Sequence, residues 1–143
     1  MREILFRGKM PVESKWAYGS LISEANVFDK RLVLTHIYDK DCNEILVDPK
    51  TVGQYTGLCD SNGRKIFEGD IVTVFYNPNY IGVSKDRVGN FIVVFHDACF
   101  MKRKITKPMS DDAGLYHFIQ SDEFKVIGNI YDNPELLGGE KNG

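Results

Sequence analysis

The chain has 143 residues, of which 43% are hydrophobic and 27% are charged, so its composition is that of a folded globular protein and excludes general disorder. This length suits one domain, or two very small ones, with a core that needs neither metals nor disulfides. Lys and Arg number 18 against 20 Asp and Glu, and the formal net charge of −2 argues against a general nucleic-acid coat.

No apolar run is long enough to cross a membrane, and charges recur too early at the N-terminus for a signal peptide. We therefore expect a cytoplasmic protein without a membrane partner. The cysteines Cys42, Cys59 and Cys99 lie far apart, and no CxxC pair occurs. This spacing favours reduced thiols that pack as small hydrophobes over a disulfide framework or a zinc ribbon.

Short β-like runs separated by turn residues follow one another along the chain, and long runs with helical periodicity are missing. Pro11 lies in a predicted hairpin connection, and 77–88 reads as a long loop. Several short strands at this spacing favour a small barrel or sandwich, so we expect a mainly β fold. The predicted strands cover 4–6, 16–22, 32–38, 44–47, 55–58, 65–67, 71–76, 91–95, 115–120 and 124–130.

Turn chemistry is clearest in the middle of the chain. Asn62-Gly63 between two apolar runs is a strong hairpin signal, because both residues tolerate positive φ. Glu68 and Asp70 are paired carboxylates on a second turn, where Gly69 permits a tight backbone. Asp70 can accept backbone N–H bonds before the next strand, so we interpret this pair as structural.

The C-terminal end contains the one helix signal. Asn133 is suited to an N-cap, Pro134 to the first helical position, and Glu135 to the positive end of the turn. Gly138 then ends the helical turn, and 138–143 is predicted to be a frayed tail.

The segment His96-Asp97-Ala98-Cys99 is the most reactive combination of side chains. His96 and Cys99 are able to form a nucleophilic pair, as in a Cys–His hydrolase, or to bind a metal together with Cys59 or His117. A continuous strand, however, places His96 and Cys99 on opposite faces. We therefore predict no catalytic, metal-binding or cofactor-binding residues, and no enzymatic activity.

A basic run follows, with Lys102, Arg103, Lys104 and Lys107 as candidate nucleic-acid contacts. Such a run is also typical of a solvated strand edge, where Lys blocks edge-to-edge pairing. Because the whole chain lacks a basic surplus, nucleic-acid binding is the alternative and not the first hypothesis.

Three motifs follow one another along the chain. They are Arg2-Glu3-Ile4 with Phe6-Arg7-Gly8-Lys9 and Trp16 with Tyr18-Gly19, then 51–58 followed by Asp60, Asn62-Gly63 and Ile66 with 68–72, and finally 126–131 with 133–137. In this order they resemble the YopX family. Cys59 departs from the charged or polar residue usual at its position in that family, which argues against a charged contact there. The motif residues interpreted as structural are Gly53, Gly57, Asp60, Gly63, Gly69, Asp70, Gly128, Asn129, Asn133 and Pro134.

The resemblance implies a phage or prophage protein without an established biochemical activity. It implies an N-terminal β subdomain over 1–50, a Src-homology-3-like β-barrel over 51–137, and self-association into a homo-oligomer. An unknown phage or host protein is the other expected partner. Aromatic side chains dominate interface energetics, and the candidate anchors are Trp16, Tyr18, Tyr55, Phe67 and Tyr131.

Overall fold

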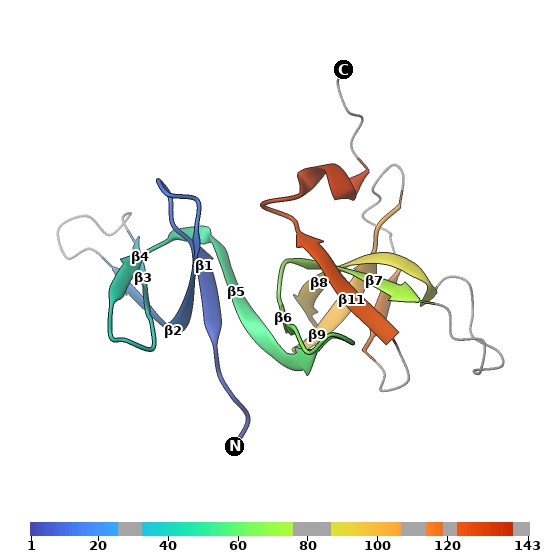
Figure 1. The fold of residues 1–143 in the computed structure, drawn as a ribbon, viewed down its shortest axis with the longest axis horizontal. Helices are drawn as coiled ribbons and strands as arrows, with labels where there is room; N and C mark the ends of the chain where they lie inside the picture. Colours follow the sequence, from blue (N-terminus) through green and yellow to red (C-terminus); the bar gives the residue numbers. More distant parts are fainter. Residues whose placement is uncertain (26–32, 76–86, 107–113, 119–122, 139–143) are drawn as a thin grey trace. The chain divides into compact units, whose positions relative to one another are not determined.

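The computed structural model describes residues 1–25, 33–75, 87–106, 114–118 and 123–138, and every statement of absence below refers to these ranges. The chain divides into two compact units, Met1–Gly57 and Leu58–Gly143 (Figure 1). The boundary predicted after residue 50 falls inside a strand. Within the described ranges the structure is almost entirely antiparallel β, which confirms the predicted mainly β class. No helix found in these ranges is long and apolar enough to span a membrane.

The first unit is built on a long antiparallel sheet. Its strands are β1 (Phe6–Lys9), β2 (Trp16–Ala25), β3 (Val33–Tyr38), β4 (Glu44–Leu46) and β5 (Asp48–Cys59), and they lie in the order β4-β3-β2-β1-β5. The predicted hairpin between β1 and β2 is confirmed, since the N–H of Met10 donates to the carbonyl of Lys15 at 2.8 Å. β5 continues past Gly57 and has β6 (Lys65–Phe67) as its next neighbour in the sheet.

One face of this sheet forms the core of the first unit. Ala17, Ile37 and Val47 are buried there, with Phe6 and Leu21 among the partly buried side chains packed against them. Gly19 is required by close packing: a Cβ at this position would overlap the carbonyl oxygen of Tyr38. The absence of a side chain therefore lets β2 and the end of β3 approach each other.

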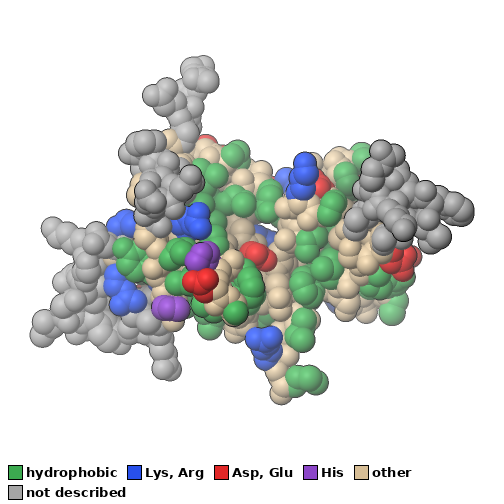
Figure 2. All heavy atoms as spheres, turned by 180° about the vertical axis from the view of Figure 1, so that it is seen from behind, with side chains coloured by type: hydrophobic (Ala, Val, Ile, Leu, Met, Phe, Trp, Pro, Cys, Tyr) green, Lys and Arg blue, Asp and Glu red, His purple; other side chains and the backbone are tan. Residues whose placement is uncertain are grey.

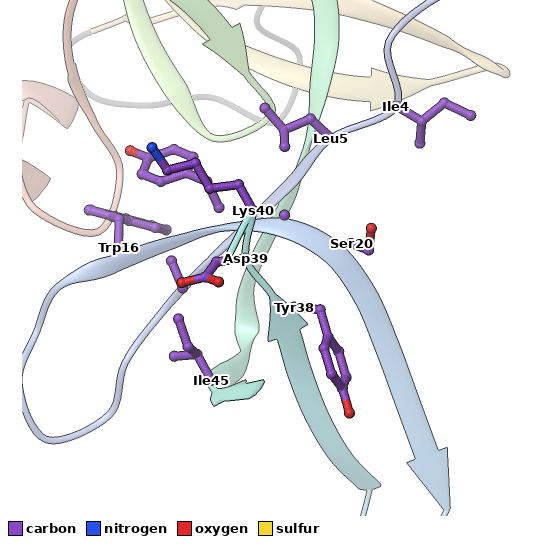
Figure 3. A pocket seen from close by; sticks show the side chains of 11 residues that line it. Ile4, Leu5, Trp16, Ser20, Tyr38, Asp39, Lys40 and Ile45 are labelled. Atoms are coloured by element: carbon purple, nitrogen blue, oxygen red, sulfur yellow. The ribbon is translucent and has the colours of Figure 1, made fainter. Parts of the chain in front are cut away.

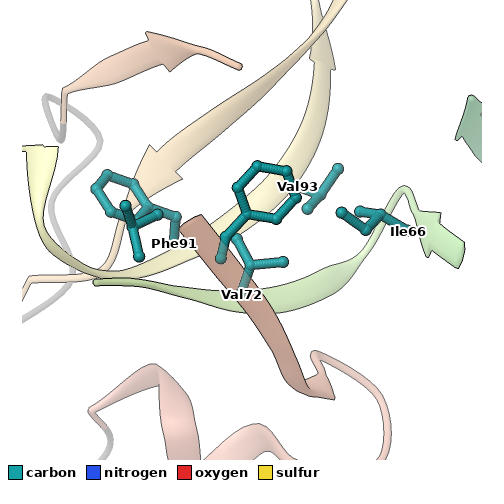
Figure 4. Close-up of a cluster of buried hydrophobic side chains, with 6 residues drawn as sticks. Ile66, Val72, Phe91 and Val93 are labelled. Carbon is teal, nitrogen blue, oxygen red and sulfur yellow. The ribbon is translucent and has the colours of Figure 1, made fainter. Parts of the chain in front are cut away.

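The second unit contains a five-stranded antiparallel sheet. Its strands are β7 (Asp70–Phe75), β8 (Gly89–His96), β9 (Cys99–Lys104), β10 (Leu115–His117) and β11 (Glu123–Asn129), and they lie in the order β10-β9-β8-β7-β11. Both end strands have a single neighbour, so the predicted barrel is not closed within the described residues. The core cluster consists of Ile66, Val72, Val74, Phe91, Val93 and Phe124, which converge on one face of the sheet (Figure 4).

Two local predictions need correction. β9 was interpreted as a possible strand edge, but it lies between β8 and β10 in the interior of the sheet order. The single helical turn is confirmed as a 3-10 helix, η2 (Pro134–Leu137), although Asn133 makes no side-chain capping bond to it. Most of the predicted loop at 77–88 and of the tail at 138–143 lies outside the described residues.

Candidate interaction surface

The Asp60 side chain connects the turn before β6 to the edge strand β11 by hydrogen bonds. Its carboxylate accepts backbone N–H bonds from Asn62 and Arg64, each at 2.9 Å, and from Val126 at 3.0 Å. Burial by itself raises the pKa of Asp60, but these hydrogen bonds and the Arg64 charge outweigh it and lower the pKa below its ordinary value. Gly63 adopts a φ of +79° in the same turn, as the Asn-Gly signal predicts.

The Gly-Asp turn before β7 is also held by backbone contacts. Gly69 has a φ of +90°, and its N–H donates to the carbonyl of Val93 at 2.8 Å. Asp70 is 1% exposed and accepts a hydrogen bond from the N–H of Phe67 at 2.8 Å, as predicted. Its carboxylate therefore lies inside the fold, while Glu68 is half-buried.

The closing motif shapes the exit from β11. The side-chain oxygen of Asn129 accepts a bond from the N–H of Asp132 at 2.8 Å, and that of Asn133 accepts one from the N–H of Asn129 at 3.2 Å. A Cβ at Gly128 would overlap the Asn133 side chain, so glycine is required for this approach. Pro134 then begins η2. Asn133 thus stabilises the preceding turn, and its Nδ2 also donates to the Glu135 carboxylate of η2 at 3.3 Å.

In the first unit, the first of the three sequence motifs forms a cation–aromatic contact. Arg7 is 3% exposed, and its guanidinium carbon lies 4.6 Å from the ring centroid of Trp16. Gly53 is buried directly opposite Arg7 on the neighbouring strand, and Gly57 has a φ of +87°. Both glycines therefore have a structural role: Gly53 leaves room beside Arg7, and Gly57 adopts a backbone conformation that other residues rarely adopt.

Not every cation of the basic run that begins at Lys102 lies on the surface. Lys102 is 0% exposed, and its ammonium lies 5.4 Å from the ring centroid of Phe91 and 5.3 Å from that of Phe118. Alternation along β9 places Lys102 on the core face, where aromatic rings compensate part of the cost of burying its charge. A buried ammonium is not accessible to a phosphate in this structure, which argues against Lys102 as a nucleic-acid contact.

The other predicted contacts differ in position. Arg103 points to the face opposite Lys102, while Lys104 shares the face of Lys102, and both are half-buried. Lys107 lies outside the described residues. The structure therefore does not bring the four cations together on one face, and nucleic-acid binding stays a prediction for Arg103 and Lys104.

The geometric argument against the His96–Cys99 pair was wrong. Asp97 and Ala98 have φ of +50° and +62° and form a tight turn, so His96 and Cys99 are directly opposed on β8 and β9. Directly opposed residues of an antiparallel pair share a face. The ring Nδ1 of His96 lies 3.2 Å from the Asp97 carboxylate, and the Cys99 thiol donates to the His96 carbonyl at 3.4 Å.

Strands β2, β3 and β4 form an exposed apolar face of the first unit. The registers Ile22↔His36 and His36↔Leu46, together with strand alternation, place Ile22, Leu34 and Leu46 around His36. Their exposed fractions are 36%, 42% and 50%. Tyr18, 44% exposed, lies on the same face farther along β2. These side chains define what we call the N-terminal apolar face.

Polar groups at this face are linked to one another. The His36 Nδ1 lies 3.5 Å from Glu44 Oε1, and Tyr38 is paired directly with Glu44 across β3 and β4. The hydrogen bond between Tyr38 and the Glu44 carboxylate, followed by the negative charge of Glu44, raises the pKa of Tyr38. The apolar side chains thus surround a hydrogen-bonded polar group.

A groove of about 520 Å³ borders this face (Figure 3). Leu5, Trp16 and Lys40 are among its lining side chains, and Gly19 also lines it. Asp39 also lines the groove. Its carboxylate, however, accepts hydrogen bonds from the N–H groups of Asp41 and Asn43 and so stabilises the following turn. The groove therefore offers mainly aromatic and aliphatic contacts.

The predicted aromatic anchors separate into two groups. Tyr18 is exposed and Trp16 lines the groove, whereas Tyr55 and Phe67 are 8% and 4% exposed and belong to the interior. Tyr131 is half-buried. Sequence reasoning missed Ile22, Leu34 and Leu46, because strands with apolar residues on both faces do not show which face is covered.

The fold and these contacts define a mainly β protein of two units whose motif residues hold turns. The chain belongs to the YopX family, whose model, described as "YopX protein", matches residues 5–138. A similar solved structure is that of protein EF1440 from Enterococcus faecalis, with 22% identity, 96% of this chain and 99% of that chain covered, and a TM-score of 0.49. No curated protein gives a significant match.

Proposed function

We propose that this protein is a non-enzymatic accessory protein of bacteriophages or prophages, acting in the host cytoplasm, and that it self-associates through the N-terminal apolar face. The observation that carries the proposal is the exposure of Ile22, Leu34 and Leu46 on adjacent strands. Contiguous apolar patches on a protein surface mark interaction sites, and burying such a patch gives the main favourable term in association.

Family membership supports the phage assignment through the resemblance described above. The same resemblance is the ground for a Src-homology-3-like second unit. The motif residues support a non-enzymatic role, because the carboxylates of Asp60 and Asp70 accept backbone N–H bonds and thereby shape turns. Acid–base catalysis would instead require a carboxylate that faces a substrate.

Sedimentation equilibrium of the purified full chain tests the self-association. We expect an oligomer at micromolar concentration, and a shift to monomer on substituting Ile22→Lys together with Leu46→Lys. Both side chains are exposed, so the charges leave the fold intact. Val12→Lys is the matched control, since Val12 is 93% exposed in the same unit but lies in the β1–β2 connection. A wild-type chain that sediments as a strict monomer contradicts the proposal.

A further inference from the structure

The turn between β8 and β9 gathers sulfur and imidazole donors on one face of the second unit. His96 is directly opposite Cys99, and Met101 is directly opposite both Val94 and His117. Strand alternation puts Cys99 and Met101 on the same side, so all four donor side chains share this face. Figure 2 shows histidine side chains at the surface of the molecule, with acidic side chains near them.

The donor groups nearest the turn are oriented by their neighbours. The His96 Nδ1 is buried and lies 3.2 Å from the Asp97 carboxylate without forming a hydrogen bond, so the exposed nitrogen of this partly exposed ring is Nε2. A carboxylate bonded to the distal nitrogen is the usual support of a metal-binding histidine, and Asp97 is near enough to take that position when the ion binds. The Cys99 sulfur lies 3.4 Å from the His96 carbonyl and is therefore held toward β8.

The chemistry of these donors selects the class of ligand. Among the described residues, no group of three or more His, Cys, Asp and Glu side chains is placed to hold a metal ion, which argues against a four-coordinate zinc site. A thiolate, a thioether and an imidazole are instead the soft donors that favour Cu(I), an ion that accepts low coordination numbers. Directly opposed side chains have Cβ atoms about 4.5–5.5 Å apart, close enough for both to reach one ion.

We propose that the β8–β9 turn is a Cu(I) site, formed by the Cys99 thiolate and His96 Nε2 with the Met101 thioether as a further donor. Cys99 loses its thiol proton to solvent when the ion binds, and the copper keeps its oxidation state. His96, and not His117, is the imidazole ligand, because a directly opposed pair is closer than a diagonal one. This site is in the second unit and is independent of the self-association proposed above.

The test is competition for Cu(I) against a chromogenic Cu(I) chelator under anaerobic, reducing conditions. The parent protein carries Cys42→Ser and Cys59→Ser, which remove the two exposed thiols. We expect one Cu(I) per chain, with the affinity lowered at least about 100-fold by Cys99→Ser and about tenfold by Asp97→Asn. Met101→Leu also weakens binding, whereas the matched changes His36→Gln and Met10→Leu leave it unchanged. Unaltered affinity in Cys99→Ser overturns the proposal.

A second measurement needs no change at the site, so it stands even if the Cys99 variant fails to fold. Histidine ring resonances are followed by NMR while Cu(I) is added to the parent protein, and protons released into weak buffer are counted. The proposal predicts a shift of the His96 resonances without a shift at His36, and one proton released per copper bound. Copper binding that shifts the His36 resonances, or that releases no proton, refutes the proposed site.

Discussion

The carboxylate of Asp60 joins the turn before β6 to β11, and its removal is the sharpest test of how the second unit is held together. Asp60→Ala leaves three backbone N–H groups without their acceptor, those of Asn62, Arg64 and Val126. The change deletes few apolar atoms, so its effect reports on hydrogen bonding. We expect a clear loss of stability at neutral pH.

The magnitude follows from the surroundings of the three donors. Asn62 and Arg64 are exposed, so water can replace the carboxylate there at a cost of about 0.5–1 kcal/mol for each bond. Val126 is half-buried in β11, and its bond spans 66 positions of the chain. Losing it costs about 1–2 kcal/mol. The free energy of unfolding should therefore fall by about 2–4 kcal/mol in total.

The assay is urea unfolding followed by far-UV circular dichroism, combined with amide hydrogen exchange at Val126. Because the pKa of Asp60 is lowered in the folded chain, its stabilising effect is complete above the pKa of an unfolded aspartate, near 3.9, and declines as the pH falls through the lowered value. The difference between wild type and Asp60→Ala should narrow in acid. Asp41→Ala, at an exposed aspartate, is the control. A loss under about 0.5 kcal/mol at pH 7, or a gap that persists in acid, would refute this reasoning.

Three further changes test local features. Asp97→Asn with Ala98→Gly places the favoured residues at two positive-φ positions and should raise the free energy of unfolding by about 1 kcal/mol, measured by thermal denaturation; an unchanged melting temperature contradicts it. Gly19→Ala drives a methyl group into the Tyr38 carbonyl and should cost about 1–3 kcal/mol, seen as earlier loss of Trp fluorescence in urea. Glu44→Gln removes the partner that raises the pKa of Tyr38, so NMR titration of this ring should give a lower pKa; an equal or higher value refutes the assignment.

Turns with a distinct residue signature were predictable from sequence, and turns without one were not. Gly63 and Gly69 have no side chain and therefore adopt positive φ readily, and the turns at both positions were predicted correctly. Asp97 and Ala98 adopt the same backbone region without either being glycine. The reversal of the chain there was missed, and with it the juxtaposition of His96 and Cys99.

The apolar face of the first unit exposes a second limit of sequence patterns. Alternation states which residues share a face, and it correctly groups Ile22 with Tyr18 on β2. It does not state which face is covered, because Ala17 and Leu21 on the other side are apolar too. Only the packing of Ile37 and Val47 against that other side shows that Ile22 remains outside.

Lys102 shows why a run of like charges is a poor guide to a binding surface. In β9, alternation sends Arg103 to one face and Lys102 to the other, where it is 0% exposed among aromatic rings. Reversing the charge of Lys102 would place a carboxylate against the negative faces of those rings and unfold the sheet whether or not nucleic acid binds. A salt-dependent binding assay on Arg103→Glu and Lys104→Glu avoids this confusion, because both side chains are partly exposed.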